Sequence, residues 1–321
     1  MKPFGLLSNP SRLSGCILAL CLVVANISHA DELDRSAAIR TLGLSALPGD
    51  PATYYSANAE LRATSLQTLL GGELAYFADQ FHAQLAPITM AVLDPHDWPS
   101  VAGDEPFGMP SVSAAKPYVF VMPADWNQVT WMDFPRREDL PPGIVKRLLQ
   151  NGKTWNEVKF EGGDGIGTHE IGHTIVYELG IDAQKHWFNE LLASYVGYAY
   201  LKARHPHHAL SSEAFWNYEL GHTPHPFTSL KDFETRYLEL QEKYPGNYGW
   251  YQVALDQRVM EVYQHSGIDF LRQVRMRFPT GSRKLSTIEL LNTLEAMNPG
   301  WITWSKHLER GQVSAVEFSR D

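Results

Sequence analysis

Two histidines and a glutamate stand close enough together in this sequence to act on one metal ion. They lie in GTHEIGHTIVYELG, residues 167–180, where Glu170 follows His169 and precedes His173. Residues four apart share one face of a helix, so both imidazoles can point at one ion while Glu170 is offset around the helix. The spacing predicts a zinc ion that lowers the pKa of a bound water, with Glu170 as general base. The alternative is an ordinary helix with two polar residues facing outward.

A catalytic zinc ion needs a third protein ligand and leaves one coordination position open. The segment WFNELLASYVGYAY, residues 187–200, places Glu190 within an otherwise apolar helical pattern. A lone carboxylate buried in such a helix is costly unless a cation lies beside it. We therefore expect Glu190 to bind zinc together with His169 and His173. The alternative is a surface glutamate on an amphipathic helix.

These two segments together resemble the gluzincin zinc metallopeptidases, which have His-Glu-x-x-His on one helix and a glutamate ligand on the next. WFNELLASYV is most similar to the second-helix segment of the aminopeptidase N-like enzymes, with its Asn-Glu-x-x-Ala-Ser-Tyr pattern. The resemblance covers residues 165–200 and, loosely, 245–275. Ser194 stands where thermolysin-like enzymes usually carry an aspartate, and the spacer of 16 residues between His173 and Glu190 is slightly short. The resemblance implies a thermolysin-like fold and hydrolysis of peptide bonds.

The resemblance also implies a hydrogen-bond donor for the oxyanion formed during hydrolysis. In aminopeptidase N-like enzymes this donor is a tyrosine that opens a helix leading to a glycine and then a phenylalanine. Tyr251 lies 16 residues before Gly267 and fits best, with Tyr248 as the alternative; both can also be ordinary aromatic residues of a tyrosine-rich chain. The motif that holds a substrate's free amine is incomplete, because residues 108–110 lack its acid. Exopeptidase activity is therefore not supported, and end-trimming and internal cleavage stay open.

The N-terminus has the pattern of an export signal. Lys2 and Arg12 are basic, and the apolar stretch of residues 13–25 is too short to span a bilayer. Small residues predict cleavage after Ala30, which gives a periplasmic or secreted protein. A lipoprotein-like box, residues 13–16, precedes the apolar stretch instead of following it, so lipid attachment is disfavoured.

Composition narrows the possible ligands and partners. Cys16 and Cys21 both lie in the leader, so no disulfide framework is expected, and histidines and carboxylates must hold any metal. Cleavage removes Lys2 and Arg12 but no acidic residue, which changes the formal net charge from −9 to −11. So acidic a chain is a poor partner for nucleic acid or an anionic membrane. The oligomeric state stays open.

The pattern of elements changes from strands to helices along the chain. Apolar periodicity predicts a helix over residues 70–85, and short apolar runs predict strands at 88–93 and 118–122. Helices are then predicted at 144–150, from 167 onward, at 187–203, 251–264 and 270–276, and after a capping box at 286–289. We expect an α+β fold in which a sheet-bearing part, residues 63–165, and a helical part, 166–321, flank a cleft, with residues 31–62 as an N-terminal extension.

Two irregular segments, a histidine cluster and two polar residues near the motif carry further expectations. Residues 94–116 and 126–142 are rich in proline and predicted to be irregular, and the first could restrict the cleft to one dedicated protein substrate. A histidine cluster is expected in polar loops, with metal binding as its alternative: His205, His207, His208, His222 and His225. Glu178 and Asn189 are candidates for orienting the ligand histidines.

The expected function is that of a zinc metallopeptidase acting on a peptide or protein substrate. The alternative is a non-catalytic, zinc-stabilised periplasmic module that binds peptides or cell wall. Glu170 argues against this module, because a structural zinc site needs no general base and usually has four protein ligands.

Overall fold

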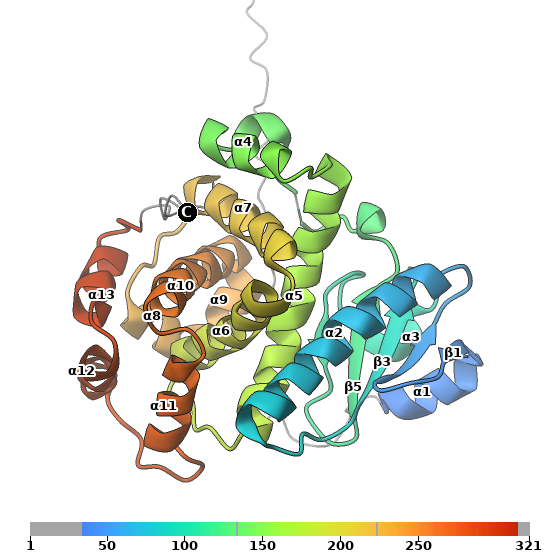
Figure 1. Ribbon diagram of the computed structural model, residues 1–321, viewed down its shortest axis with the longest axis horizontal. Coiled ribbons are helices and arrows are strands. Elements are labelled where there is room, and N and C mark those ends of the chain that lie inside the picture. The colour runs from blue at the N-terminus through green and yellow to red at the C-terminus, as the bar shows by residue number, and fades with distance from the viewer. Residues whose placement is uncertain (1–33, 133, 223, 314–321) are drawn as a thin grey trace, which may run out of the picture.

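The chain folds into a small sheet followed by a large helical part, as a computed structural model shows (Figure 1). The structure describes residues 34–132, 134–222 and 224–313, and of residues 218–222 the backbone only. The expected leader, residues 1–30, lies outside the described residues together with its cleavage site. The α+β class is confirmed.

Five strands form one mixed sheet in the order β1-β2-β3-β5-β4. Their bounds are Ser45–Leu47 for β1, Ala52–Tyr55 for β2, Ile88–Leu93 for β3, Ser111–Val112 for β4 and Tyr118–Pro123 for β5. β2, β3 and β5 run parallel, and β1 and β4 are antiparallel edge strands. The two predicted strands are thus β3 and β5. Their continuous apolar sequences suit strands that are covered on both faces.

Two segments without clear periodicity also belong to the sheet part. Residues 31–62, the expected extension, contain α1 (Arg35–Leu42), β1, β2 and the start of α2 (Glu60–Phe81). Residues 94–116 contain α3 (Trp98–Ala102) and β4, so the prediction of one long loop is wrong. Elements this short hold too few residues for a period to be recognised.

Helices make up most of the rest of the described chain. They are α4 (Pro142–Gln150), α5 (Trp155–Glu178), α6 (His186–Arg204), α7 (Pro206–His222), α8 (Leu230–Thr235), α9 (Tyr237–Lys243), α10 (Pro245–Ser266), α11 (Asp269–Arg277), α12 (Thr287–Met297) and α13 (Trp301–Glu309). Residues 126–142 hold only the 3-10 turns η1 (Trp126–Gln128) and η2 (Arg137–Asp139) before α4 begins. None of the helices within the described ranges is long and apolar enough to cross a membrane.

Several helices differ from the sequence prediction. α2 spans Glu60–Phe81, whereas residues 70–85 were expected. α5 begins at Trp155, because Thr154 and Glu157 form a capping box there, and the glycine-rich stretch before the motif lies inside the helix. α7 is a helix where polar loops were expected, since Pro206 occupies its first turn, the place where a helix tolerates proline. α10 begins at Pro245, so Tyr251 lies in its second turn and does not open the helix.

α5 runs through the middle of the molecule, with the sheet and α2 on one side and α6, α7 and α10 on the other (Figure 1). Glycines let its neighbours come close. A Cβ at Gly172 would overlap the backbone carbonyl of Ala193 on α6, and one at Gly197 on α6 would lie 2.8 Å from Thr168 Oγ1. Gly172 therefore allows close backbone packing of α6 beside the motif.

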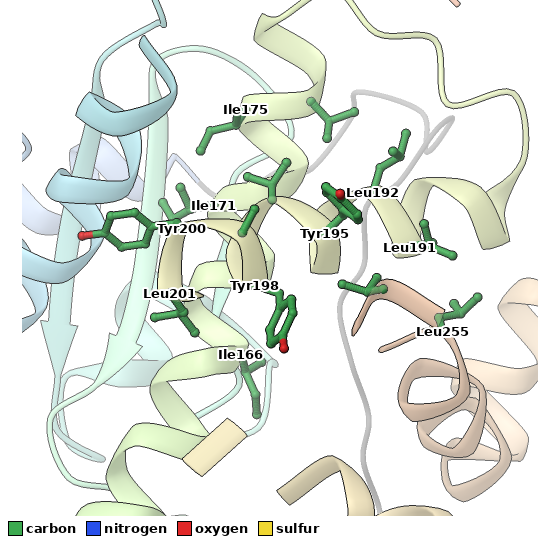
Figure 2. Close-up of a cluster of buried hydrophobic side chains, with 14 of the residues drawn as sticks. Ile166, Ile171, Ile175, Leu191, Leu192, Tyr195, Tyr198, Tyr200, Leu201 and Leu255 are labelled. Carbon is green, nitrogen blue, oxygen red and sulfur yellow. The ribbon is translucent and has the colours of Figure 1, made fainter. Parts of the chain in front are cut away.

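Apolar side chains fill the space around this crossing. Ile171, Ile175 and Leu179 form an apolar stripe along α5, and all three are buried. Figure 2 shows Ile171 and Ile175 in a cluster with side chains from α6 and with Leu255 of α10. The core therefore fixes α5 and α6 relative to each other, and with them the motif residues.

Candidate metal centre

Four helices surround the residues that the sequence singles out. α5 packs against α6 and α7, and α10 packs against the same two helices. His169, Glu170 and His173 lie on α5, and Glu190 lies on α6. All four are buried, with exposed fractions between 0 and 8%. The alternative, an ordinary helix with two polar residues facing outward, is therefore wrong, and each of these polar groups needs a partner in the interior.

The three predicted ligands converge on one point. His169 Nε2 lies 3.2 Å from His173 Nε2, and Glu190 Oε2 lies 3.3 Å and 3.5 Å from these two nitrogens. Ligands held at about 2.0–2.1 Å around a tetrahedral ion stand about 3.3 Å apart. The observed triangle has this size. His169, Glu170 and His173 also form a buried group whose ligand atoms lie close enough together to hold a metal ion.

Hydrogen bonds on the far side of each imidazole fix its orientation. His169 Nδ1 lies 2.9 Å from Ser194 Oγ, and His173 Nδ1 lies 3.1 Å from the side-chain amide of Asn189. The assignment of amide oxygen and nitrogen follows from the network. With the Asn189 oxygen turned to His173, each Nδ1–H donates outward and each Nε2 keeps its lone pair for a metal. Asn189 therefore occupies the orienting position considered from the sequence.

Glu190 is held by two residues that the sequence did not single out. The Tyr237 hydroxyl on α9 donates to Glu190 Oε1 at 2.6 Å, and Gln252 Nε2 on α10 donates to Glu190 Oε2 at 2.9 Å. Both donors favour the ionised carboxylate. They also fix the rotamer that turns Oε2 towards the two imidazoles.

The charges at the centre support one another. Burial favours the neutral form of Glu190, but the charges of His173 and His169 and their hydrogen bonds outweigh it and hold the pKa of Glu190 well below its ordinary value. Burial also opposes a charged His169, yet its hydrogen bond to Glu190 and the charges of Glu170, Glu190 and Asp256 raise the pKa of His169. Ionised carboxylates beside imidazoles in the interior form a site that a divalent cation satisfies.

Glu170 lies beside the triangle formed by His169, His173 and Glu190, within the same buried group. Its Oε1 atom is 3.7 Å from His169 Nε2, whereas Glu190 approaches the same nitrogen to 3.3 Å. This placement follows from the helix, on which consecutive residues point about 100° apart. A carboxylate so placed can exchange a proton with a group bound next to the ligands.

The structure does not bring Tyr251 to the centre. Its hydroxyl donates to the backbone oxygen of Ser229 at 2.8 Å, and its ring packs on Phe233. Tyr248 is buried with its ring stacked on Phe233 and edge-on to Tyr237. Gln252 occupies the next position along α10 from Tyr251, and it is this residue that reaches Glu190.

Other candidates lie away from the centre. Glu178 accepts hydrogen bonds from the Tyr118 hydroxyl and the backbone of Ala86, so it connects α5 to the sheet and does not orient a ligand histidine. In the histidine cluster, His205 bonds the Tyr200 hydroxyl and His208 bonds the backbone oxygen of Glu161. The side chain of His222 lies outside the description. His225 stacks on Trp250, and His207 lies on α7.

Comparisons with known proteins give no further guide to this centre. No protein-family model matches the chain, and searches of curated proteins and of solved structures found no match either.

Proposed function

We propose that this chain is a zinc-dependent metallopeptidase of the gluzincin type. One observation carries the proposal: a buried triangle of two imidazole nitrogens and one carboxylate oxygen with the edges of a tetrahedral site, and beside it the second carboxylate of Glu170, farther from His169 Nε2 than Glu190 is. A structural zinc site would have four protein ligands and no such neighbour. The similarity of residues 187–196 to aminopeptidase N-like enzymes supports a peptide or protein as the substrate.

His169, His173 and Glu190 would hold the zinc ion, which when bound acts as a Lewis acid and lowers the pKa of water. Glu170 accepts the proton from the attacking water and passes it to the departing amine. Tyr237 and Gln252 hold Glu190 in its ligand rotamer through the two hydrogen bonds that they donate. The hydroxyl of Tyr251 is engaged elsewhere, so it has no role in this scheme.

The expected export signal places the enzyme in the periplasm or outside the cell. Internal cleavage and removal of terminal residues both remain compatible with the centre, because neither depends on the ligand triangle. An acidic chain is expected to act on peptides rather than on nucleic acid or a membrane surface.

The test compares the mature protein with Glu170→Gln on a complex peptide mixture, with the products read by mass spectrometry and bound zinc measured for both proteins. Wild type should cleave peptides, and the variant should retain zinc but lose cleavage, because only the proton acceptor has changed. Equal cleavage by both proteins would remove Glu170 from the mechanism. Zinc binding by wild type without any cleavage would instead favour the zinc-stabilised binding module.

A further inference from the structure

Two polar residues of α10 face the metal centre from outside the ligand set. Gln252 and Asp256 are four residues apart and therefore lie on the same face of the helix. Both are buried, with exposed fractions of 2% and 5%. Gln252 bonds Glu190 directly, and Asp256 lies within side-chain hydrogen-bond reach of Ser194. Because Ser194 in turn bonds His169 Nδ1, α10 reaches one ligand on α6 and one on α5.

Burying the Asp256 carboxyl lowers the stability of the fold unless a neighbouring group interacts with it. Burial raises the pKa of the Asp256 carboxyl to about 7, and the hydrogen bond from Ser194 and the charge of His169 offset only part of this effect. Its Oδ1 atom has no hydrogen-bond partner among the described residues, and the same is true of Gln252 Oε1. A helix that only had to pack would carry apolar residues at both positions.

A small cavity explains how these two acceptor atoms are accommodated. It has a volume of about 30 Å³ and lies between α5, α6, α7 and α10. Thr168, His169, Ser194, Gln252 and Asp256 contribute its polar lining, and Figure 2 shows part of its larger apolar lining, Ile166, Tyr198 and Leu201. A cavity of this size has room for about one water molecule, which would donate to acceptors such as Asp256 Oδ1.

We propose that Ser194 and Asp256 are positioning residues for the metal centre, in which Asp256 fixes the Ser194 hydroxyl and this hydroxyl holds the ring of His169. The proposal rests on the proposed function only in requiring that the centre binds a metal. Thermolysin-like enzymes usually carry an aspartate at the position of Ser194. In this chain the carboxylate comes instead from Asp256 on α10, which contacts the Ser194 hydroxyl. Such partners orient the imidazole and raise its basicity as a ligand.

The test measures the zinc Kd of the full mature protein by competition with a chromophoric chelator. Ser194→Ala and Asp256→Asn should each weaken zinc binding by about 10–100-fold, the effect of removing an outer partner of a ligand. The double variant should be no weaker than the poorer single variant, because both changes break one path. Two independent structural effects would instead multiply.

Ser212→Ala is the matched control. Ser212 is buried on α7 against Gly165, one turn from His169, and its hydroxyl has no hydrogen-bond partner among the described residues. Its removal should leave the Kd within about twofold of wild type. Cobalt-loaded protein gives a second readout: the visible spectrum should change in Ser194→Ala and stay unchanged in Ser212→Ala, because only the former frees the ring of His169.

The outcomes separate this inference from the proposed function. If wild type binds zinc and Ser194→Ala matches it in Kd and cobalt spectrum, the positioning role is overturned while the peptidase proposal stands. If wild type binds no zinc, both fall. Should Asp256→Asn fail to fold, Ser194→Ala and Ser194→Thr decide: the threonine keeps the hydroxyl and must restore affinity, and equal losses in the two variants would overturn the proposal.

Discussion

Glu190 is the residue whose removal tests the proposed metal centre most directly, because it is the proposed ligand from the second helix. Its side chain is fully buried, and its Oε2 atom lies 3.3 Å and 3.5 Å from the two ligand nitrogens. Glu190→Ala deletes this atom and leaves His169 and His173 alone at the site. Alanine suits the interior of α6, so we expect a folded protein that has lost most of its zinc affinity.

The size of the effect follows from the number of ligands. Four-ligand zinc sites bind with about 10–16 kcal/mol, or about 3–4 kcal/mol for each ligand, which is about 10²–10³-fold in Kd. Free zinc at about 100 times the wild-type Kd stabilises the wild-type fold by about 2.7 kcal/mol, and the variant by about 0.4 kcal/mol or less. For a chain of this size the entropy of unfolding is about 0.6 kcal/mol/K, so we expect zinc to raise Tm by about 4–5 °C in wild type and by less than about 1 °C in Glu190→Ala.

The assay is thermal unfolding of metal-free protein with and without buffered zinc. Glu178→Ala is the control, because Glu178 is a partly buried carboxylate on α5 that bonds Tyr118 and the backbone of Ala86. It should lower the Tm of the metal-free protein and keep the full zinc-induced increase. An equal increase in Glu190→Ala and wild type would show that Glu190 is not a ligand and would refute the reasoning from the donor triangle.

Three further predictions concern stability and the reaction. Burial raises the pKa of Glu73 well above its ordinary value, so the free energy of unfolding should fall as pH rises above about 4.5, and Glu73→Gln should flatten this fall in urea titrations at pH 5 and pH 8. Gly172→Ala should lower the free energy of unfolding by about 1–2 kcal/mol, because its Cβ meets the Ala193 carbonyl, whereas Gly143→Ala, with open space around it, should not. Tyr251→Phe should leave kcat within a few-fold of wild type; a fall of about 10²–10³-fold would make it the oxyanion donor after all.

Local sequence signals predicted the parts of the fold that depend on local interactions. The central strands β3 and β5 are continuous apolar runs, and α12 follows a capping box in which Ser286 and Glu289 bond each other's backbone. The edge strands were missed because two or three residues cannot show alternation. α7 was missed because proline and histidines suggest a loop, although Pro206 in the first turn is compatible with a helix.

The proposed ligands could also be predicted from local sequence signals. His169 and His173 are related by one helical turn, and the cost of burying Glu190 in an apolar helix can be estimated without knowing the fold. The partners of Glu190 could not be found in this way. Tyr237 and Gln252 lie 47 and 62 residues further along the chain, and only the packing of α9 and α10 against α6 brings them to the carboxylate.

The sequence does contain one signal that leads beyond the ligands. α10 is buried along most of its length, yet Gln252 and Asp256 recur on one face at the spacing of a helical turn. Two buried polar residues in register are costly unless they serve the same group, so their spacing indicates a shared polar partner. In the fold, Gln252 bonds Glu190 on α6, and Asp256 bonds Ser194, whose hydroxyl in turn contacts His169 on α5. A search for such a polar pair, added to the search for His-Glu-x-x-His, predicts that a third helix faces the metal centre. The aromatic spacing that favoured Tyr251 selects a neighbouring face of that same helix.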